Sequence, residues 1–254
     1  MIYYIIVALP FLFFFSGILL TNFIIPHFKK KSLYNQMRER SDWPTIEKTQ
    51  NTLKKLFKGE HAKISSIIYR NLRLITDKEF VYGEIDFLSF HNILEKAGPK
   101  PQEIFYDLGS GAGKAVFTAA FFFDLSKSCG IELLPPLYTK AINKLKKATS
   151  LFQNIKSDFE TTYLKQVDTI QFINDSFLNY DFNDANIIYV AATCLSDSTW
   201  KILINKMAAL KPGSRIIVAT KSIHHDNFEI IYQGVELMSW GLCPVNIYKI
   251  KKRL

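Results

Sequence analysis

A glycine-rich turn between two short apolar segments constrains this chain more than any other feature. Residues 103–132 read EIFYDLGSGAGKAVFTAAFFFDLSKSCGIE. The apolar residues at 104–106 and 108 are typical of a strand buried on both faces. Residues 114–124 are apolar almost all round, as expected of a helix packed on a sheet. With a second strand at 128–131, the segment is predicted to form a strand, a tight turn, a helix and a parallel strand.

Glycines and acids at the strand ends predict a nucleoside site. Gly109, Gly111 and Gly113 let the backbone turn sharply and approach a ligand without a Cβ in the way. Asp107 precedes them, and Glu132 ends the second strand 25 residues further on. An acid there can accept hydrogen bonds from both hydroxyls of a ribose. Since Asp107 would repel a pyrophosphate but can bind an amino-acid ammonium, S-adenosylmethionine (SAM) fits better than NAD.

A polar cluster after the next predicted strand offers a place for the adenine of such a ligand. Asp175 and Ser176 follow the strand predicted at 169–173. Either could accept a hydrogen bond from the adenine amino group, and Phe177 is available to stack on the ring.

The remaining pattern predicts an α/β fold, a doubly wound, seven-stranded Rossmann-like sheet with helices on both faces. Besides the first two strands and the helix between them, further helices are expected at 85–96, 137–148 and 198–210. Further strands are expected at 169–173, 186–192, 215–220, 229–237 and 244–250. The last two of these form a hairpin at the sheet edge.

The N-terminal segment predicts a membrane anchor. Residues 2–25 are 24 residues without a charge, enough to cross a hydrocarbon core of roughly 30 Å as a helix. A cleavable signal peptide would need a basic start, a shorter apolar core and a small-residue cleavage site, which are missing. Lysines follow at 29–31. The positive-inside rule then predicts a single-pass membrane protein with its main domain on the cytoplasmic side.

Charge and cysteine usage exclude two other classes of partner. The formal net charge is +9, much of it concentrated at the two ends of the chain. Such runs are usually solvated faces, so no nucleic-acid partner is expected. The three cysteines, Cys129, Cys194 and Cys243, have no metal-binding spacing. We therefore expect no metal site, and free thiols suit a reducing compartment.

Several short segments, in this order, resemble the non-SET histone-lysine methyltransferases of the disruptor-of-telomeric-silencing (Dot-one) type. They are VYGE (81–84), YDLGSGAGKAV (106–116), GIE (130–132), SFL (176–178), ALKPGSRIIVATK (209–221), MSW (238–240) and CPV (243–245). The resemblance implies a class I methyltransferase that transfers a methyl group from SAM to a lysine amine of a protein. The expected organisation is a transmembrane helix (1–26), a basic helical connector (27–78) and a SAM-dependent methyltransferase domain (79–254).

The resemblance also implies roles for individual residues on the cofactor side. Tyr82 and Glu84 belong to a loop that closes over the cofactor. The methionine end is held by Asp107 and the glycine turn, the ribose by Glu132, and the adenine by Asp175 or Ser176 with Phe177. The full predicted cofactor set is Tyr82, Glu84, Asp107, Gly109, Ser110, Gly111, Gly113, Lys114, Glu132, Asp175, Ser176 and Phe177.

The acceptor side departs from the family pattern. Ala191 and Ala192 stand where the family has paired asparagines, Ile247 replaces a tyrosine that lines the lysine channel, and Lys114 replaces a glutamine. No catalytic residue is therefore assigned. Candidates for shaping the acceptor channel, each of which could equally be core packing, are Tyr189, Thr193 and Trp240.

The expected function is a membrane-tethered, SAM-dependent protein-lysine N-methyltransferase. Methyl transfer to an amine needs little acid–base chemistry, because a neutral amine aligned with the sulfonium methyl reacts directly. One alternative resembles the membrane-anchored methyltransferases of the ATP-synthase c-subunit type, which act on a membrane-protein lysine. The others are a small-molecule methyltransferase and a catalytically inactive SAM-binding sensor or scaffold.

Overall fold

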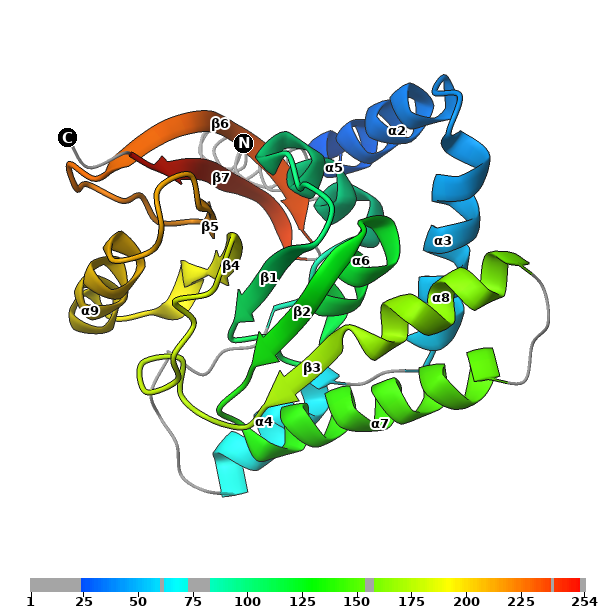
Figure 1. Cartoon of the computed structure of the whole chain (residues 1–254), viewed down its shortest axis with the longest axis horizontal. Helices are drawn as coiled ribbons and strands as arrows, with labels where there is room; N and C mark the ends of the chain where they lie inside the picture. The colour runs from blue at the N-terminus through cyan, green and yellow to red at the C-terminus, as the bar shows by residue number, and fades with distance from the viewer. Residues whose placement is uncertain (1–23, 60–61, 73–82, 154–157, 239, 252–254) are drawn as a thin grey trace, which may run out of the picture.

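The chain folds into a seven-stranded mixed sheet with helices on both faces (Figure 1). The computed structural model describes residues 24–59, 62–72, 83–153, 158–238 and 240–251. The strands are β1 (Glu103–Leu108), β2 (Leu125–Ile131), β3 (Ile170–Ile173), β4 (Ile187–Ala191), β5 (Arg215–Ala219), β6 (Phe228–Met238) and β7 (Gly241–Ile250). The predicted seven-stranded α/β sheet is confirmed.

The strand order, β3-β2-β1-β4-β5-β7-β6, reverses direction between β1 and β4. Strands β1 to β5 are parallel, whereas β7 runs antiparallel to both of its neighbours. In open sheets of this kind, ligands bind outside the carboxyl ends of the strands where the order reverses. The topology therefore places a ligand site beyond the ends of β1 and β4.

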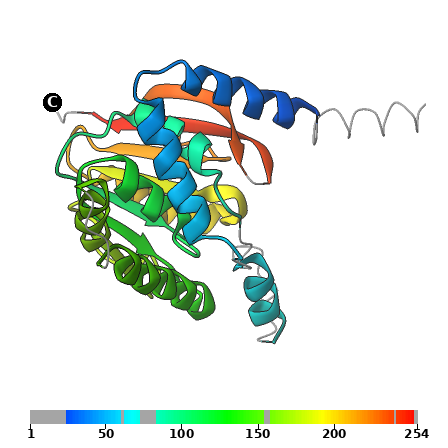
Figure 2. The same ribbon diagram turned by 90° about the vertical axis from the view of Figure 1, so that its right-hand side faces the viewer.

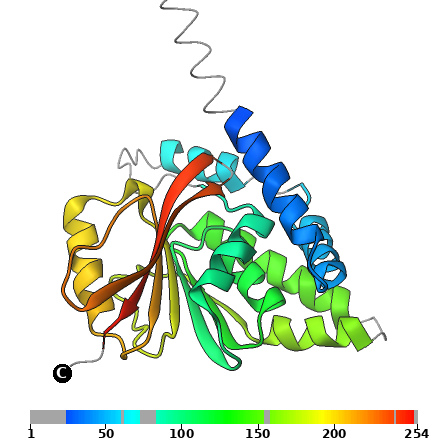
Figure 3. The same cartoon turned by 90° about the horizontal axis from the view of Figure 1, so that it is seen from above.

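Two separate cores lie on the two faces of the sheet. Figure 3 shows α9 on one side of the strands and α5 to α8 on the other. The helices are α2 (Ile25–Arg38), α3 (Trp43–Leu56), α4 (Ala62–Leu72), α5 (Phe87–Ala97), α6 (Lys114–Phe122), α7 (Pro135–Gln153), α8 (Asp158–Asp168), η3 (Ala192–Cys194, a 3₁₀ turn) and α9 (Asp197–Ala208). The core beneath α5 and α6 is rich in aromatic rings, whereas Trp200, Leu203 and Met207 of α9 fill the other.

Helix α3, from the basic segment before the sheet, is part of the larger core. Leu53 and Leu56 are fully buried in it. Phe57, directly after the helix, lies 5.4 Å from the ring of Phe117 and 5.5 Å from that of Phe87. The Lys144 ammonium donates to the carbonyl of Leu56 at 3.1 Å, where the partial negative charge of a helix end favours a cation. These contacts fix α3 against α5, α6 and α7.

Local capping positions helix α5 and the loop before it. The Asp86 carboxylate accepts a hydrogen bond from the Ser89 amide at 3.2 Å, and Gly98 ends the helix in the left-handed conformation. Ile85, predicted as the first helical residue, instead pairs with Met238 of β6. This bridge joins the residues before α5 to the β6–β7 hairpin, close to the carboxyl ends of the parallel strands.

The predicted membrane localisation is corrected. Within the described ranges, no helix is both long and apolar enough to cross a bilayer. The first described helix, α2, carries three successive lysines at 29–31 and lies beside β6 (Figure 2). Most of the segment predicted to span the membrane, 2–25, lies outside the described residues. Neither a membrane partner nor a single-pass, cytoplasm-facing arrangement is assigned to this chain.

Candidate cofactor site

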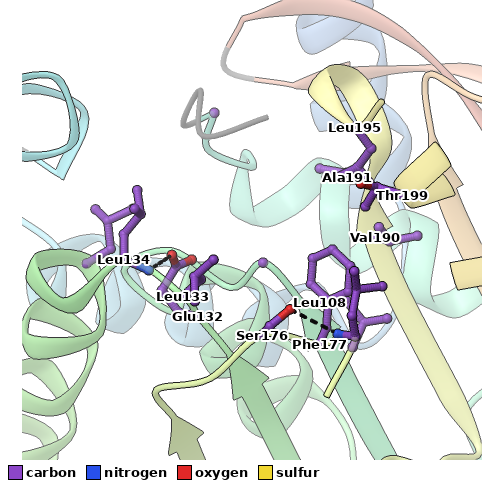
Figure 4. Close-up of a pocket in the computed structure, with 14 residues that line it drawn as sticks. Leu108, Glu132, Leu133, Leu134, Ser176, Phe177, Val190, Ala191, Leu195 and Thr199 are labelled. Atoms are coloured by element: carbon purple, nitrogen blue, oxygen red, sulfur yellow. Dashed lines mark hydrogen bonds between the residues drawn. The ribbon is translucent and has the colours of Figure 1, made fainter. Parts of the chain in front are cut away.

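A cavity of about 260 Å³ opens at the carboxyl ends of the parallel strands, where the strand order reverses. Figure 4 shows residues that follow β2 on one side of it and residues that end or follow β4 on the other. It is lined by Gly83, Leu108, Gly109, Glu132, Leu133, Leu134, Leu137, Ser176, Phe177, Leu178, Val190, Ala191, Leu195 and Thr199. Four residues of the predicted cofactor set, Gly109, Glu132, Ser176 and Phe177, are among them.

The glycine turn is anchored to the end of β2. Gly109 and Ser110 both donate their amides to the carbonyl of Ile131, at 2.9 and 3.0 Å. Gly113 has φ +88°, and a Cβ there would lie 2.5 Å from the Phe172 ring, so only glycine fits. These contacts fix the position of the turn relative to the end of β2. Helix α6 begins directly after the turn.

Glu132 is the charged group that faces the cavity most directly. One carboxylate oxygen accepts from the Gly111 amide at 2.8 Å and the other from the Leu134 amide at 2.7 Å. Burial raises the pKa of this carboxyl, and the backbone amides partly offset that rise. Each oxygen keeps further lone pairs, so a preoriented carboxylate remains able to accept ribose hydroxyls.

Asp107, unlike Glu132, lies behind the wall of the cavity. It is buried in β1, paired with Gly130 on one side and Tyr189 on the other, and it does not line the cavity. Burial and the negative charge of Glu132 raise its pKa well above the usual range. A cation brought next to Asp107 would favour the ionised form of this carboxyl.

The predicted closing loop is held by two contacts. The Lys114 ammonium forms an ion pair with the Glu84 carboxylate, across the first turn of α6. Gly83 packs flat against the Trp240 indole, where a Cβ would lie 2.7 Å from the ring. Tyr82 lies outside the described residues. Lys114, predicted in the cofactor set, thus holds the end of the loop and does not line the cavity.

The adenine candidates separate into two groups. Ser176 and Phe177 line the cavity, whereas the Asp175 carboxylate accepts from the Ser176 amide at 2.6 Å and does not line it. The Ser176 hydroxyl accepts from the Leu178 amide at 3.2 Å (Figure 4). Sequence reasoning missed the apolar wall, which is formed by Leu133, Leu134, Leu137 and Leu195. Its only sequence signal is the run of leucines immediately after Glu132.

The three candidates for the acceptor channel occupy different environments. Tyr189 is buried beneath α5, with its ring 4.7 Å from that of Phe90. Trp240 covers Gly83 and is partly exposed. Thr193 is exposed and accepts a weak hydrogen bond from Thr220 at 3.3 Å.

The positions where the chain departs from the family pattern also differ in exposure. Ala191, the last residue of β4, lines the cavity, whereas Ala192, which follows it, is fully buried in the core beneath α9. Ile247 is fully buried in β7 and pairs with Ile217. Apolar side chains therefore stand at all three positions, and of these only Ala191 reaches the cavity.

Comparison with known proteins agrees with this geometry. TrmN from Thermus thermophilus superposes with a TM-score of 0.51 at 15% identity, covering 68% of this chain and 51% of that one. Its likeness shows the fold alone, a Rossmann-like sheet flanked by helices. The chain belongs to the family described as histone methylation protein DOT1, whose model matches residues 71–248. The resemblance predicted from the sequence is confirmed.

Two curated relatives carry the name histone-lysine N-methyltransferase, H3 lysine-79 specific. The one from Caenorhabditis elegans is 30% identical over 167 residues, covering 60% of this chain and 16% of that protein. The one from Kluyveromyces lactis is 28% identical over 185 residues, covering 69% of this chain and 31% of that protein. The chain thus spans less than a third of the length of these relatives.

Proposed function

We propose that this chain is a SAM-dependent protein-lysine N-methyltransferase with a histone lysine as its acceptor. The observation that carries the proposal is the Glu132 carboxylate, held by two backbone amides at the wall of a cavity beside a glycine turn. Membership of the DOT1 family and the names of the curated relatives support SAM as donor and a histone lysine as acceptor.

The chain's own residues fit the three parts of the cofactor. The methionine ammonium would be held at Asp107, the ribose hydroxyls at Glu132, and the adenine ring at Phe177 and Ser176 with the leucine wall around it. When bound, SAM supplies an electrophilic methyl group on a positively charged sulfur. The protein's part is to orient that group and exclude water, because positioning provides most of the rate for this reaction.

On the acceptor side, the apolar surface can favour the reactive form of the lysine. An amine that leaves water for a site walled by side chains such as Trp240 and Ala191 loses hydration, which lowers its pKa and favours the neutral form. The neutral amine has the lone pair that attacks the methyl carbon. No side chain of this chain needs to act as a strong base.

A second candidate function is a SAM-binding sensor that does not transfer the methyl group. Ala191 supports it, because this alanine lines the cavity where the family places an asparagine. Such a protein would keep the donor contacts at Glu132 and lack a productive acceptor channel. The two functions make the same prediction for SAM binding and opposite predictions for methyl transfer.

The test combines titration calorimetry with a transfer assay on the full chain. We expect SAM and S-adenosylhomocysteine to bind and NAD not to bind. The protein is then incubated with methyl-labelled SAM and either histone H3, reconstituted nucleosomes or a cell lysate, and labelled lysines are mapped by mass spectrometry. Label on a histone lysine supports the transferase, SAM binding without any label supports the sensor, and absence of SAM binding overturns both.

A further inference from the structure

The Tyr189 hydroxyl is a buried polar group with no hydrogen-bond partner among the described residues. Its residue is only 3% exposed, and the ring packs edge-on against Phe90. Buried hydroxyls in native proteins are nearly always hydrogen-bonded, so one without a partner calls for a reason. Packing alone does not supply it, because phenylalanine would fill the same space without a polar atom.

The position of Tyr189 in the sheet supplies the reason. Tyr189 on β4 pairs directly with Asp107 on β1, so the two side chains leave the sheet side by side on the same face. Gly109 follows Asp107 by two residues, and Ala191 follows Tyr189 by two residues. Both Gly109 and Ala191 line the cavity. Both of these residues are small, because glycine has no side chain and alanine has a single methyl group, so little side-chain bulk stands next to the pair on this face of the sheet.

We infer that the Tyr189 hydroxyl and the Asp107 carboxylate form one subsite for the protonated amine of the cofactor's amino-acid moiety. This inference rests on the proposed function and adds a residue to its donor side. An ammonium has three N–H donors. One can donate to the Asp107 carboxylate and another to the Tyr189 oxygen, which would satisfy the hydroxyl that is otherwise unpartnered.

The charges around the pair suit this role. Asp107 faces Glu132 from β2, and Tyr189 faces Asp107 from β1 and the Cys243 thiol from β7. Burial and the Asp107 charge raise the pKa of Tyr189, so its hydroxyl stays neutral. None of these four groups carries a positive charge. A cationic ligand would therefore interact favourably with each of them.

The test substitutes Tyr189→Phe, which removes one oxygen and keeps the packing against Phe90. Dissociation constants are measured by titration calorimetry for SAM, for S-adenosylhomocysteine and for 5′-methylthioadenosine, which lacks the amino-acid moiety. We expect the substitution to weaken SAM and S-adenosylhomocysteine about tenfold, as typical of a lost hydrogen bond to a charged group. The affinity for 5′-methylthioadenosine should stay within about twofold of the wild type.

Tyr248→Phe is the matched control. Tyr248 is equally buried in β7, on the other face of the sheet, and its hydroxyl accepts a hydrogen bond from the Ile223 amide at 2.9 Å. Its loss should lower the melting temperature and leave all three affinities unchanged. Tyr189→Phe, which breaks no hydrogen bond of the free protein, should melt at the wild-type temperature or slightly above it.

Two results would overturn the inference while leaving the proposed function intact. The first is a wild-type affinity of the Tyr189→Phe protein for SAM. The second is an equal loss of affinity for SAM and for 5′-methylthioadenosine, which would assign Tyr189 a general packing role. If the wild-type chain binds neither SAM nor S-adenosylhomocysteine, the proposed function fails and the inference fails with it.

Discussion

The donor and acceptor sides of the candidate site are built in different ways. On the donor side, Glu132 is fixed by two backbone amides, and the turn beside it is anchored to the carbonyl of Ile131. On the proposed acceptor side, Gly83 and Ala191 line the same cavity and Trp240 packs on Gly83, and the three residues belong to distant segments of the chain. Donor geometry is thus specified locally, whereas acceptor geometry depends on how separate elements pack.

This difference predicts that donor and acceptor functions can be separated by substitution. A change in the turn or in its acids should remove cofactor binding. A change at the hairpin should leave cofactor binding intact and alter only the methyl transfer. The predictions below test that separation, beginning with the largest expected effect.

Asp107→Asn should abolish SAM binding and stabilise the free protein. We expect the dissociation constant to rise more than about 100-fold, since a buried charge partner of the ammonium is lost. An acid whose folded pKa is raised stabilises the fold below its unfolded pKa, and that contribution is lost as pH rises through the folded pKa. Because the loss begins above the ordinary pKa of an unfolded aspartate, the asparagine variant, which cannot ionise, should melt at a higher temperature than the wild type at neutral pH without ligand.

Calorimetry and thermal melts of both proteins, with and without SAM, check this prediction. Lys221→Gln serves as a control, because the ion pair it breaks joins Asp197, a fully exposed carboxylate, and should change neither quantity. Retention of wild-type SAM affinity by the asparagine variant would contradict the role of Asp107.

Trp240→Ala should reduce methyl transfer far more than it reduces cofactor binding. Trp240 packs on Gly83 at the tip of the β6–β7 hairpin and does not line the cofactor cavity. We expect the methyl-transfer rate to fall roughly 10- to 100-fold, because a misplaced acceptor loses alignment, while the SAM dissociation constant changes by less than about threefold. Single-turnover transfer and calorimetry measure the two quantities. A large loss of SAM affinity would show that the hairpin belongs to the donor side.

Gly113→Ala should destabilise the turn more than the same change at a matched glycine. Gly113 and Gly213 both have φ +88°, but a Cβ at Gly113 meets the Phe172 ring, whereas nothing lies within 4 Å of a Cβ at Gly213. The left-handed conformation costs alanine about 1–2 kcal/mol at both positions. Overpacking against Phe172 should add about 1–3 kcal/mol at Gly113 alone. Urea denaturation measures the free energy of unfolding of both variants. Equal losses of stability would mean that the turn shifts at no cost to make room for the added methyl group.

Much of the donor side could be predicted from the sequence because its signals are local. The apolar strand, the alternate glycines and the acid at Glu132 lie within one short segment, and the structure brings them together as the pattern indicates. Asp107 was also identified, but its depth beneath the cavity was not, since burial depends on β2 and β4 pairing on either side of it. The ion pair of Lys114 with Glu84 likewise joins residues whose contact no spacing rule predicts.

Other parts of the fold were missed for physical reasons. At the start of β2, Leu125 is followed by the exposed Ser126 and the half-buried Lys127, and these polar residues resemble a loop in the sequence. Helix α8 has a weak apolar pattern and is held by tertiary contacts with α6 and α7. The leucine wall of the cavity, which includes Leu134 and Leu195, carries no chemical signature in the sequence, because leucine is equally common in any core.

The most direct measurement is calorimetric titration of the full chain with SAM from pH 5 to pH 8, in buffers of different ionisation enthalpy. Burial raises the pKa values of both Asp107 and Glu132 in the free protein, and the negative charge of Glu132 adds to the rise at Asp107. A cationic ligand favours their ionised forms, so binding should release protons, and affinity should rise with pH until both acids are ionised. SAM binding that tightens with pH and releases protons is the result expected. No binding, or binding that neither depends on pH nor exchanges protons, would contradict the central claim that these two buried carboxylates hold a cationic cofactor.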